Sequence, residues 1–339
     1  MQHFVIVGIL VIITTILTYL GLDVAGLAKQ QHPIAASAQS VSIDQLWQWE
    51  MIVISFLFAV IFVPMMYSLV AFRQKKGEMK DGEHMEGNTS LEIAWTVIPL
   101  FLVVIFAYLG GWSLGEVRRV DPQALVINVK GQQFTWTFEY PEYGIITNEL
   151  HLPADRQVVL KMTSIDVIHS FWVPEFRIKQ DVVPGRITEY RVTPTLVGNY
   201  KVRCAELCGT SHAYMENAVI VNTQADYDAW IAEQAELAKL AAQTPEGQGR
   251  LLTVRNGCTG CHSLDGTPLT GPTWFNIFGK TEEMNDGSTL VIDEAYLIES
   301  ILNPNAKIVA GFPSPSVMPA FVFSDEELAN IIAYIKTLK

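Results

Sequence analysis

Long apolar stretches dominate the N-terminal third of the chain. Residues 4–22 are almost entirely aliphatic, and residues 51–72 and 93–113 contain no charged side chain. A helix needs about 20 predominantly apolar residues to cross a bilayer, so each stretch predicts a transmembrane helix. Pro64 and Pro99 lie inside the second and third stretches, which is compatible with membrane helices because these tolerate proline more often than soluble helices do.

The first stretch has a second interpretation as a cleaved signal peptide. No Lys or Arg precedes it, and the nearest Ala-x-Ala motif, at residues 36–38, lies well beyond its end. Both features favour a retained helix over residues 1–22.

Basic residues are distributed unevenly between the two connecting loops. The first loop contains only Lys29, whereas the second carries four basic residues: Arg73, Lys75, Lys76 and Lys80. Positive charge marks cytoplasmic loops, so residues 73–92 are expected inside and everything after residue 113 outside. The expected location is a bacterial plasma membrane, with the later domains on its outer face.

After the third stretch the pattern changes to short β-type runs. These runs are separated by Pro and Gly turns and lie at residues 125–130, 134–140, 158–162 and 218–221. Several short strands at this spacing predict a β-sandwich or barrel.

The C-terminal part alternates helical and turn signals. Residues 225–242 are rich in Ala, Glu, Gln and Leu, which favour helix, and residues 244–249 indicate a linker. Ser324 and Glu327 form a capping-box pattern that opens a final helix.

These patterns predict a multidomain membrane protein. The expected parts are a transmembrane helix (1–22), a transmembrane hairpin (45–115), an all-β domain (116–224), a helical linker (225–247) and an all-α domain (248–339). The net charge of −12 argues against nucleic-acid binding, which rests on neutralising phosphates with Lys and Arg.

One twelve-residue segment concentrates soft metal ligands. It contains Cys204, Cys208, His212 and Met215, and thiolate, thioether and imidazole together favour copper. Two cysteines on one loop can bridge two ions, and His169 is the best candidate for a second nitrogen ligand. The competing interpretations are a zinc site, since Cys2His2 is a zinc ligand set, or a pair of buried free cysteines beside a core histidine.

A second motif indicates covalent haem. Cys258, Cys261 and His262 form a Cys-x-x-Cys-His sequence, typical of c-type haem attachment, although a stray CxxC redox or zinc site is an alternative. Met318 is the best candidate for the distal iron ligand. Met284 is a rival that is better interpreted as a surface loop residue.

Residues 45–222 resemble subunit II of haem–copper cytochrome c oxidases. The resemblance rests on the 204–215 loop and on five further segments, at residues 91–99, 131–133, 139–141, 169–174 and 183–186. It implies a cupredoxin-like Greek-key fold with a mixed-valence dinuclear copper centre, CuA. Cys204 and Cys208 would bridge the coppers, His169 and His212 would each supply one nitrogen, and Met215 would be a weak ligand.

The same resemblance assigns roles to two glutamates. The Glu206 carbonyl would be a weak copper ligand, and its side chain would reach a Mg or Mn ion shared with subunit I. Glu92 would mark a proton-uptake path, whereas without the family it is an ordinary carboxylate at a helix start. The family usually has Trp where this chain has Phe134, a position associated with electron transfer from a soluble cytochrome c, and Trp136 is nearby.

The region from residue 248 onward resembles a class I cytochrome c. Gly271-Pro272, residues 277–279, Met318-Pro319 and residues 324–338 match that family, which implies His262 and Met318 as iron ligands. A fused cytochrome c is the arrangement of caa3-type oxidases.

The combined resemblance implies electron transfer from an external donor to haem c, then to CuA, then to the oxygen-reducing site of subunit I in a proton-pumping complex. Subunits I and III would be partners, and the donor would be a cytochrome, a blue copper protein or an upstream complex. The alternatives are the electron-accepting subunit of a nitric oxide reductase, a membrane-tethered copper-delivery or copper-storage protein, and a quinol oxidase subunit, which would not need the copper ligands.

Overall fold

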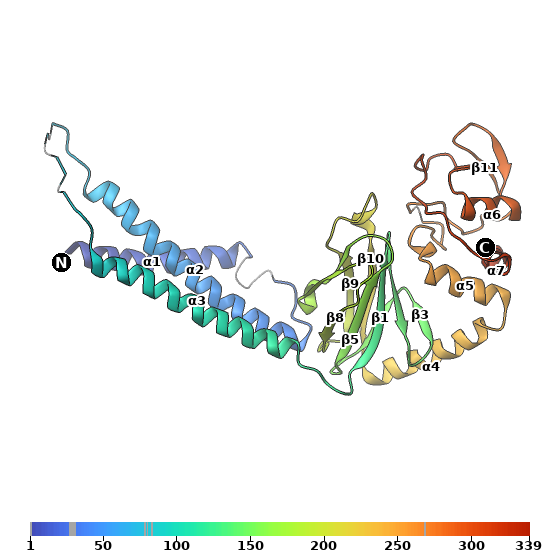
Figure 1. The fold of residues 1–339 in the computed structure, drawn as a ribbon, viewed down its shortest axis with the longest axis horizontal. Helices are drawn as coiled ribbons and strands as arrows, with labels where there is room; N and C mark the ends of the chain where they lie inside the picture. The colour runs from blue at the N-terminus through green and yellow to red at the C-terminus, as the bar shows by residue number, and fades with distance from the viewer. Residues whose placement is uncertain (1, 27–31, 78, 80, 83, 268) are drawn as a thin grey trace. The chain divides into compact units, whose positions relative to one another are not determined.

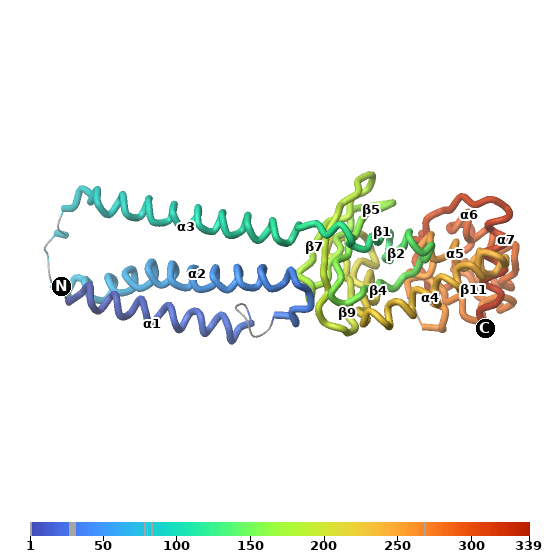
Figure 2. Tube along the Cα trace, turned by 90° about the horizontal axis from the view of Figure 1, so that it is seen from below, coloured from blue at the N-terminus to red at the C-terminus, as the bar shows by residue number. Residues whose placement is uncertain are grey.

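Three long apolar helices make up the N-terminal part of the described chain: α1 (Gln2–Val24), α2 (Ala38–Ala71) and α3 (Thr89–Val117). Each is long and apolar enough by length and composition to cross a membrane, so the three predicted apolar stretches all form helices. Their apolar side chains are largely exposed on all sides, as expected for helices whose surroundings are lipid. In Figures 1 and 2, α1 and α2 run side by side.

Local capping explains where two of these helices begin. The Ser37 side chain accepts a hydrogen bond from the Ser40 amide at the start of α2, and Asn88 does the same for Leu91 at the start of α3. Pro64 and Pro99 remain inside their helices.

The computed structural model describes residues 2–26, 32–77, 79, 81–82, 84–267 and 269–339. Lys29 and Lys80, which contribute to the predicted orientation, lie outside the described residues, as does Met1. Among the described residues the chain divides into two units, Met1–Arg119 and Val120–Lys339.

Two five-stranded sheets form the β domain in the described part of the second unit. Their strand orders are β3-β2-β1-β5-β8 and β4-β10-β9-β6-β7, so the chain crosses repeatedly between sheets as in a Greek-key sandwich. The strands are β1 (Leu125–Gln132), β2 (Thr135–Tyr140), β3 (Ile145–Thr147), β4 (Leu150–Pro153), β5 (Val158–Ser164), β6 (His169–Val173), β7 (Ile178–Val182), β8 (Thr188–Val192), β9 (Gly198–Cys204) and β10 (Glu216–Asn222).

Aromatic side chains fill the core between the sheets. Trp136 and Phe138 on β2 and Phe171 on β6 are almost fully buried, and the rings of Trp136 and Phe171 meet edge to face. The Tyr140 hydroxyl donates to the His151 carbonyl and accepts from the His151 amide. The contact between Trp136 and Phe171 packs β2 against β6, the strand that begins with His169.

The predicted helix after the β domain is α4 (Gln224–Ala241). Thr223 caps its first turn by accepting a hydrogen bond from the Asp226 amide. Trp230 stacks on His151 with ring centroids 4.0 Å apart, and Tyr227 is buried. Both aromatic residues pack α4 against the β domain.

The C-terminal domain contains α5 (Pro245–Arg255), α6 (Glu294–Leu302), α7 (Asp325–Thr337) and the short strands β11 (Thr281–Glu283) and β12 (Thr289–Val291). Figure 2 shows these helices grouped near the C-terminus. The capping box of Ser324 and Glu327 at the start of α7 is confirmed.

The prediction of a linker over residues 244–249 is wrong for most of that segment. Thr244 caps α5 through the Gly247 amide, and Pro245 is the first helical residue, where proline is favoured because its missing N–H has no helical partner. Gly249 is buried where α5 crosses α7, so packing offsets the weak helix propensity of glycine.

Candidate metal and haem sites

The predicted copper ligands begin with three buried side chains at one end of the β domain. His169 opens β6, Cys204 closes β9, and Cys208 follows in the next loop. Pairing of β6 with β9 brings these segments together. Cys204 Sγ lies 3.8 Å from His169 Nδ1 and 3.8 Å from Cys208 Sγ, and the three ligand atoms lie within 4.8 Å of one another.

His212 and Met215 extend the cluster beyond Cys208. Cys208 Sγ lies 3.4 Å from His212 Nδ1 and 3.8 Å from Met215 Sδ. The Glu206 carbonyl lies 3.2 Å from Cys204 Sγ, while its side chain is exposed. Each sulfur therefore faces its own histidine.

This arrangement fits copper better than a single zinc ion. A Cys2His2 zinc site surrounds one ion with four ligands, but the described group within 4.8 Å contains His169, Cys204 and Cys208 and not His212. Two thiolates between two imidazoles, with a thioether beside one of them, are a soft donor set suited to a copper pair.

The two thiols have different affinities for protons. Burial raises the pKa of Cys204, but hydrogen bonds with His169 and with the backbone of Glu206 and Ser170 outweigh it and lower the pKa to about 6. Burial and the neighbouring Cys204 charge raise the pKa of Cys208 to about 12. A metal that binds both sulfurs must displace the remaining proton, because the thiolate is the ligand form.

Asp166 orients His169. The His169 Nε2–H donates to Asp166 Oδ1 over 2.8 Å, and the Val167 amide holds the same oxygen at 2.7 Å. Burial lowers the pKa of His169, but its bonds with Asp166 and Cys204 outweigh that effect and raise it to about 9. With Nε2 bound to a carboxylate, Nδ1 is directed at the sulfur, as is common for histidine ligands of metals.

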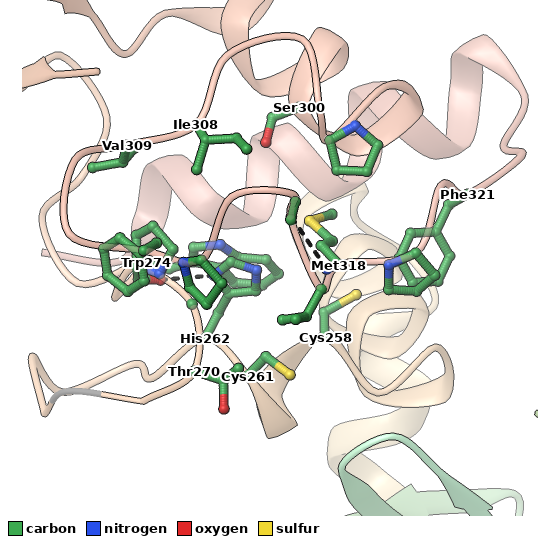
Figure 3. A pocket seen from close by; sticks show the side chains of 18 of the residues that line it. Cys258, Cys261, His262, Thr270, Trp274, Ser300, Ile308, Val309, Met318 and Phe321 are labelled. Atoms are coloured by element: carbon green, nitrogen blue, oxygen red, sulfur yellow. Dashed lines mark hydrogen bonds between the residues drawn. The ribbon is translucent and has the colours of Figure 1, made fainter. Parts of the chain in front are cut away.

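The haem motif surrounds a separate cavity. Cys258 begins the short helix η3 (Cys258–Gly260), and Cys261 and His262 follow it. With Met318 and Trp274 they line about 1070 Å³ of space, the open mouth included. Figure 3 shows the labelled side chains of Cys258, Cys261, His262 and Met318 around this cavity.

His262 is held for ligation through one nitrogen. Its Nδ1–H donates to the Pro272 carbonyl over 2.7 Å, and its ring stacks on Trp274 with centroids 4.9 Å apart. Burial lowers the pKa of His262 against the opposing effect of Pro272. The neutral ring therefore keeps the Nε2 lone pair for a metal. A Cβ at Gly271 would lie 2.7 Å from His262 Cε1, so only glycine fits beside the ring.

The two thiols of this motif line the cavity together. Burial raises the pKa of Cys258 to about 12 and also raises that of Cys261. Both cysteines lie on the wall of the same cavity as His262, an arrangement compatible with thioether attachment of a haem.

The structure separates the two candidate distal methionines. Met318 lines the same cavity as Cys258, Cys261 and His262. Met284 does not line it; it is 2% exposed and packs in the domain core. The prediction that Met284 is a surface loop residue is therefore wrong, because strand pairing of Met284 with Val309 draws it inward.

Glu92 lies in the first turn of α3. Its carboxylate accepts a hydrogen bond from the Asn88 amide over 3.3 Å, so it has a local capping role whatever its part in proton uptake.

Sequence reasoning missed Asp166 and Gly271. Asp166 precedes His169 by three residues, a spacing at which a turn can return a carboxylate to the ring. Gly271 enters the sequence analysis only as part of the Gly271-Pro272 match. Its close approach to the His262 ring depends on how the loop between them folds, which the residue types do not reveal.

Comparison with known families matches three parts of the chain. Residues 144–223 match "Cytochrome C oxidase subunit II, periplasmic domain", residues 25–110 match "Cytochrome C oxidase subunit II, transmembrane domain", and residues 248–339 match "Cytochrome c".

Individual proteins are similar over most of the chain. Cytochrome c oxidase subunit 2 of Alkalihalophilus pseudofirmus is 33% identical, covering 85% of this chain and 84% of the relative. The protein of the same name from Synechocystis is 35% identical, covering 60% of this chain and 75% of the relative. The crystal structure of the periplasmic domain of subunit II of cytochrome oxidase from Bradyrhizobium japonicum is 28% identical, with a TM-score of 0.32, and covers 35% of this chain and 97% of that one.

Proposed function

The chain belongs to the cytochrome c oxidase subunit II family, and we propose that it carries electrons from an external donor through haem c and CuA to subunit I. Family membership makes it a component of an oxidoreductase complex with a haem–copper subunit I as partner. It is a membrane protein whose soluble domains lie on the periplasmic side. The fused cytochrome c domain fits the caa3 type.

The convergence of His169, Cys204, Cys208, His212 and Met215 is the single observation that carries the proposal. The thiolates of Cys204 and Cys208 would hold the copper pair, and His169 and His212 would each supply one nitrogen ligand. Met215 and the Glu206 carbonyl would be weak ligands. The short distances between the sulfurs and their nearest histidines support these roles. The bound copper pair supplies a one-electron acceptor, while Asp166 holds the His169 ring in place.

Cys258 and Cys261 would hold the haem through thioether bonds, and His262 and Met318 would be its iron ligands. The cavity between these residues and the Pro272 bond to His262 support this assignment. Methionine with histidine raises the haem potential relative to ligation by two harder donors, which suits a group placed between a soluble donor and copper.

Further roles follow from the family. The exposed Glu206 side chain binds Mg or Mn at the boundary with subunit I, and Glu92 marks a proton-uptake path. Subunit III is a second partner in a proton-pumping complex. The donor is a cytochrome, a blue copper protein or an upstream complex. The membrane anchor comprises residues 1–22 and the transmembrane hairpin residues 45–115. The CuA domain comprises residues 116–224, the linker residues 225–247 and the haem domain residues 248–339.

Optical and EPR spectroscopy of the purified, metal-loaded oxidase complex tests the proposal. We expect an EPR signal in which one unpaired electron is shared between two equivalent coppers. We also expect a c-type haem spectrum that is assigned to this chain. A mononuclear copper signal, or copper without covalent haem, would refute it. The latter result would favour the copper-delivery alternative.

A further inference from the structure

The turn between β1 and β2 contacts both redox sites within the second unit. Gln132, Gln133 and Phe134 line the cavity that also contains Cys258 and Cys261. The Gln132 side chain donates to the Asn256 carbonyl next to the haem motif over 2.5 Å. A Cβ at Gly257 would lie 1.7 Å from Gln132 Nε2, so the haem segment approaches this turn as closely as glycine permits.

Gln133 connects this turn to both copper-ligand segments. Its side-chain Nε2–H donates to the Cys208 carbonyl over 2.5 Å. Its backbone amide donates to Asp166 Oδ2 over 2.7 Å, and the other oxygen of that carboxylate accepts from His169. Gln133 is thus joined to Cys208 by one hydrogen bond and to His169 by two, through Asp166.

Phe134 provides the contact on the haem side. Phe134 lines the same cavity as Cys261, whose sulfur is proposed to carry the haem. The Phe134 ring is 7% exposed, and a Cβ at Gly209 in the copper loop would lie 3.0 Å from that ring. The aromatic position linked in the family to soluble donors is therefore covered here by the chain itself.

A second contact holds the same two loops together. The Ser211 hydroxyl of the copper loop lies 2.8 Å from the Thr270 hydroxyl, and Thr270 is at the rim of the haem cavity in Figure 3. Ser211 is buried. The loops are thus joined at separate points rather than through one side chain.

We propose that Gln133, with the peptide that joins it to Phe134, is the internal electron route from haem c to CuA. This inference rests on the proposed function. The route runs from the haem cavity, which Phe134 and Gln133 line, along the chain to the Gln133 side chain, and across its hydrogen bond to the Cys208 carbonyl. One electron leaves ferrous haem, which becomes ferric, and reduces the mixed-valence copper pair. No covalent bond forms or breaks, and no proton is transferred.

The route depends on the Gln133 side chain. Gln133→Leu removes the donor to Cys208 and keeps a side chain of similar size, so internal electron transfer should slow several-fold. Gln180→Leu is the matched control, because the Gln180 side chain donates only weakly to its neighbour, over 3.4 Å.

Flash photoreduction of the intact, metal-loaded oxidase measures this step directly. A soluble ruthenium photoreductant reduces the haem, and reoxidation is followed at the haem absorbance band together with bleaching of the near-infrared copper band. Redox titrations and EPR of each variant verify that both centres are present with unchanged potentials. If Gln133→Leu fails to assemble, Gln133→Glu replaces the donor with an oxygen at nearly constant length.

The outcomes separate the route from the function. A slower rate in Gln133→Leu with unchanged spectra and potentials, and a normal rate in Gln180→Leu, supports the route. A normal rate in Gln133→Leu, or an equal loss in Gln180→Leu, overturns the route and leaves the proposed function standing. Absence of the dicopper signal in the wild type overturns both.

Discussion

Replacing Gly249 with alanine should destabilise the C-terminal domain. Gly249 lies in α5, and a Cβ built there would be 1.9 Å from the Asn330 carbonyl oxygen and 2.9 Å from Tyr334 Cβ. The obstacle is the backbone of α7, so the helix must shift as a unit. Overpacking of this kind costs about 1–3 kcal/mol, and a backbone obstacle places the cost at the upper end.

Alanine also has a favourable effect that reduces this cost. Its helix propensity exceeds that of glycine by about 1 kcal/mol, which leaves a net loss of about 2 kcal/mol. For a domain of this size, such a loss lowers Tm by about 8–16 °C.

Thermal unfolding of the haem-loaded full chain, followed by haem absorbance, measures the effect. Arg250→Ala is the matched control, because this neighbouring α5 residue is exposed and surface changes stay within about 0.5 kcal/mol. A Gly249→Ala protein that unfolds within the range of the control would refute the close helix contact.

Three further predictions follow from the sites and the core. Met318→Ala should abolish the sulfur-to-iron absorbance band of the haem and lower its potential; an unchanged band would exclude Met318 as the ligand. Cys208→Ser should replace the shared two-copper EPR pattern with a mononuclear one, and a persistent pattern would contradict bridging by Cys208. Burial raises the pKa of Tyr140 and Tyr227 above the ordinary value of 10.0. Their contribution to stability is therefore complete below about pH 10 and is lost as the pH rises toward their folded-state values. Denaturant titrations should show the free energy of unfolding falling above about pH 10. The fall should be smaller in Tyr227→Phe. A wild-type protein that shows no fall would contradict the burial of the two hydroxyls.

Local patterns predicted the elements of the chain well. The apolar stretches predicted α1, α2 and α3, because spanning a bilayer requires a continuous run of apolar residues. The capping box predicted the start of α7, because its hydrogen bonds join residues only three positions apart. Residues 244–249 were misinterpreted because Pro and Gly signal turns in general, whereas here Pro245 opens a helix and Gly249 serves a contact with α7.

Residue types and spacing alone predicted the chemistry that is proposed for both sites. The ligands of each centre are concentrated in short segments whose residue types and spacing suit few metals, so Cys204–x3–Cys208 and Cys258–x2–Cys261–His262 are recognisable without a fold. The sequence did not reveal which side chains surround these ligands. The bond from Gln133 to Cys208 and the burial of Met284 beside Val309 join residues far apart in the chain, so they depend on which strands pair and which loops close. The bond between Asp166 and His169 joins residues three positions apart, but it depends on a turn conformation that the residue types do not specify.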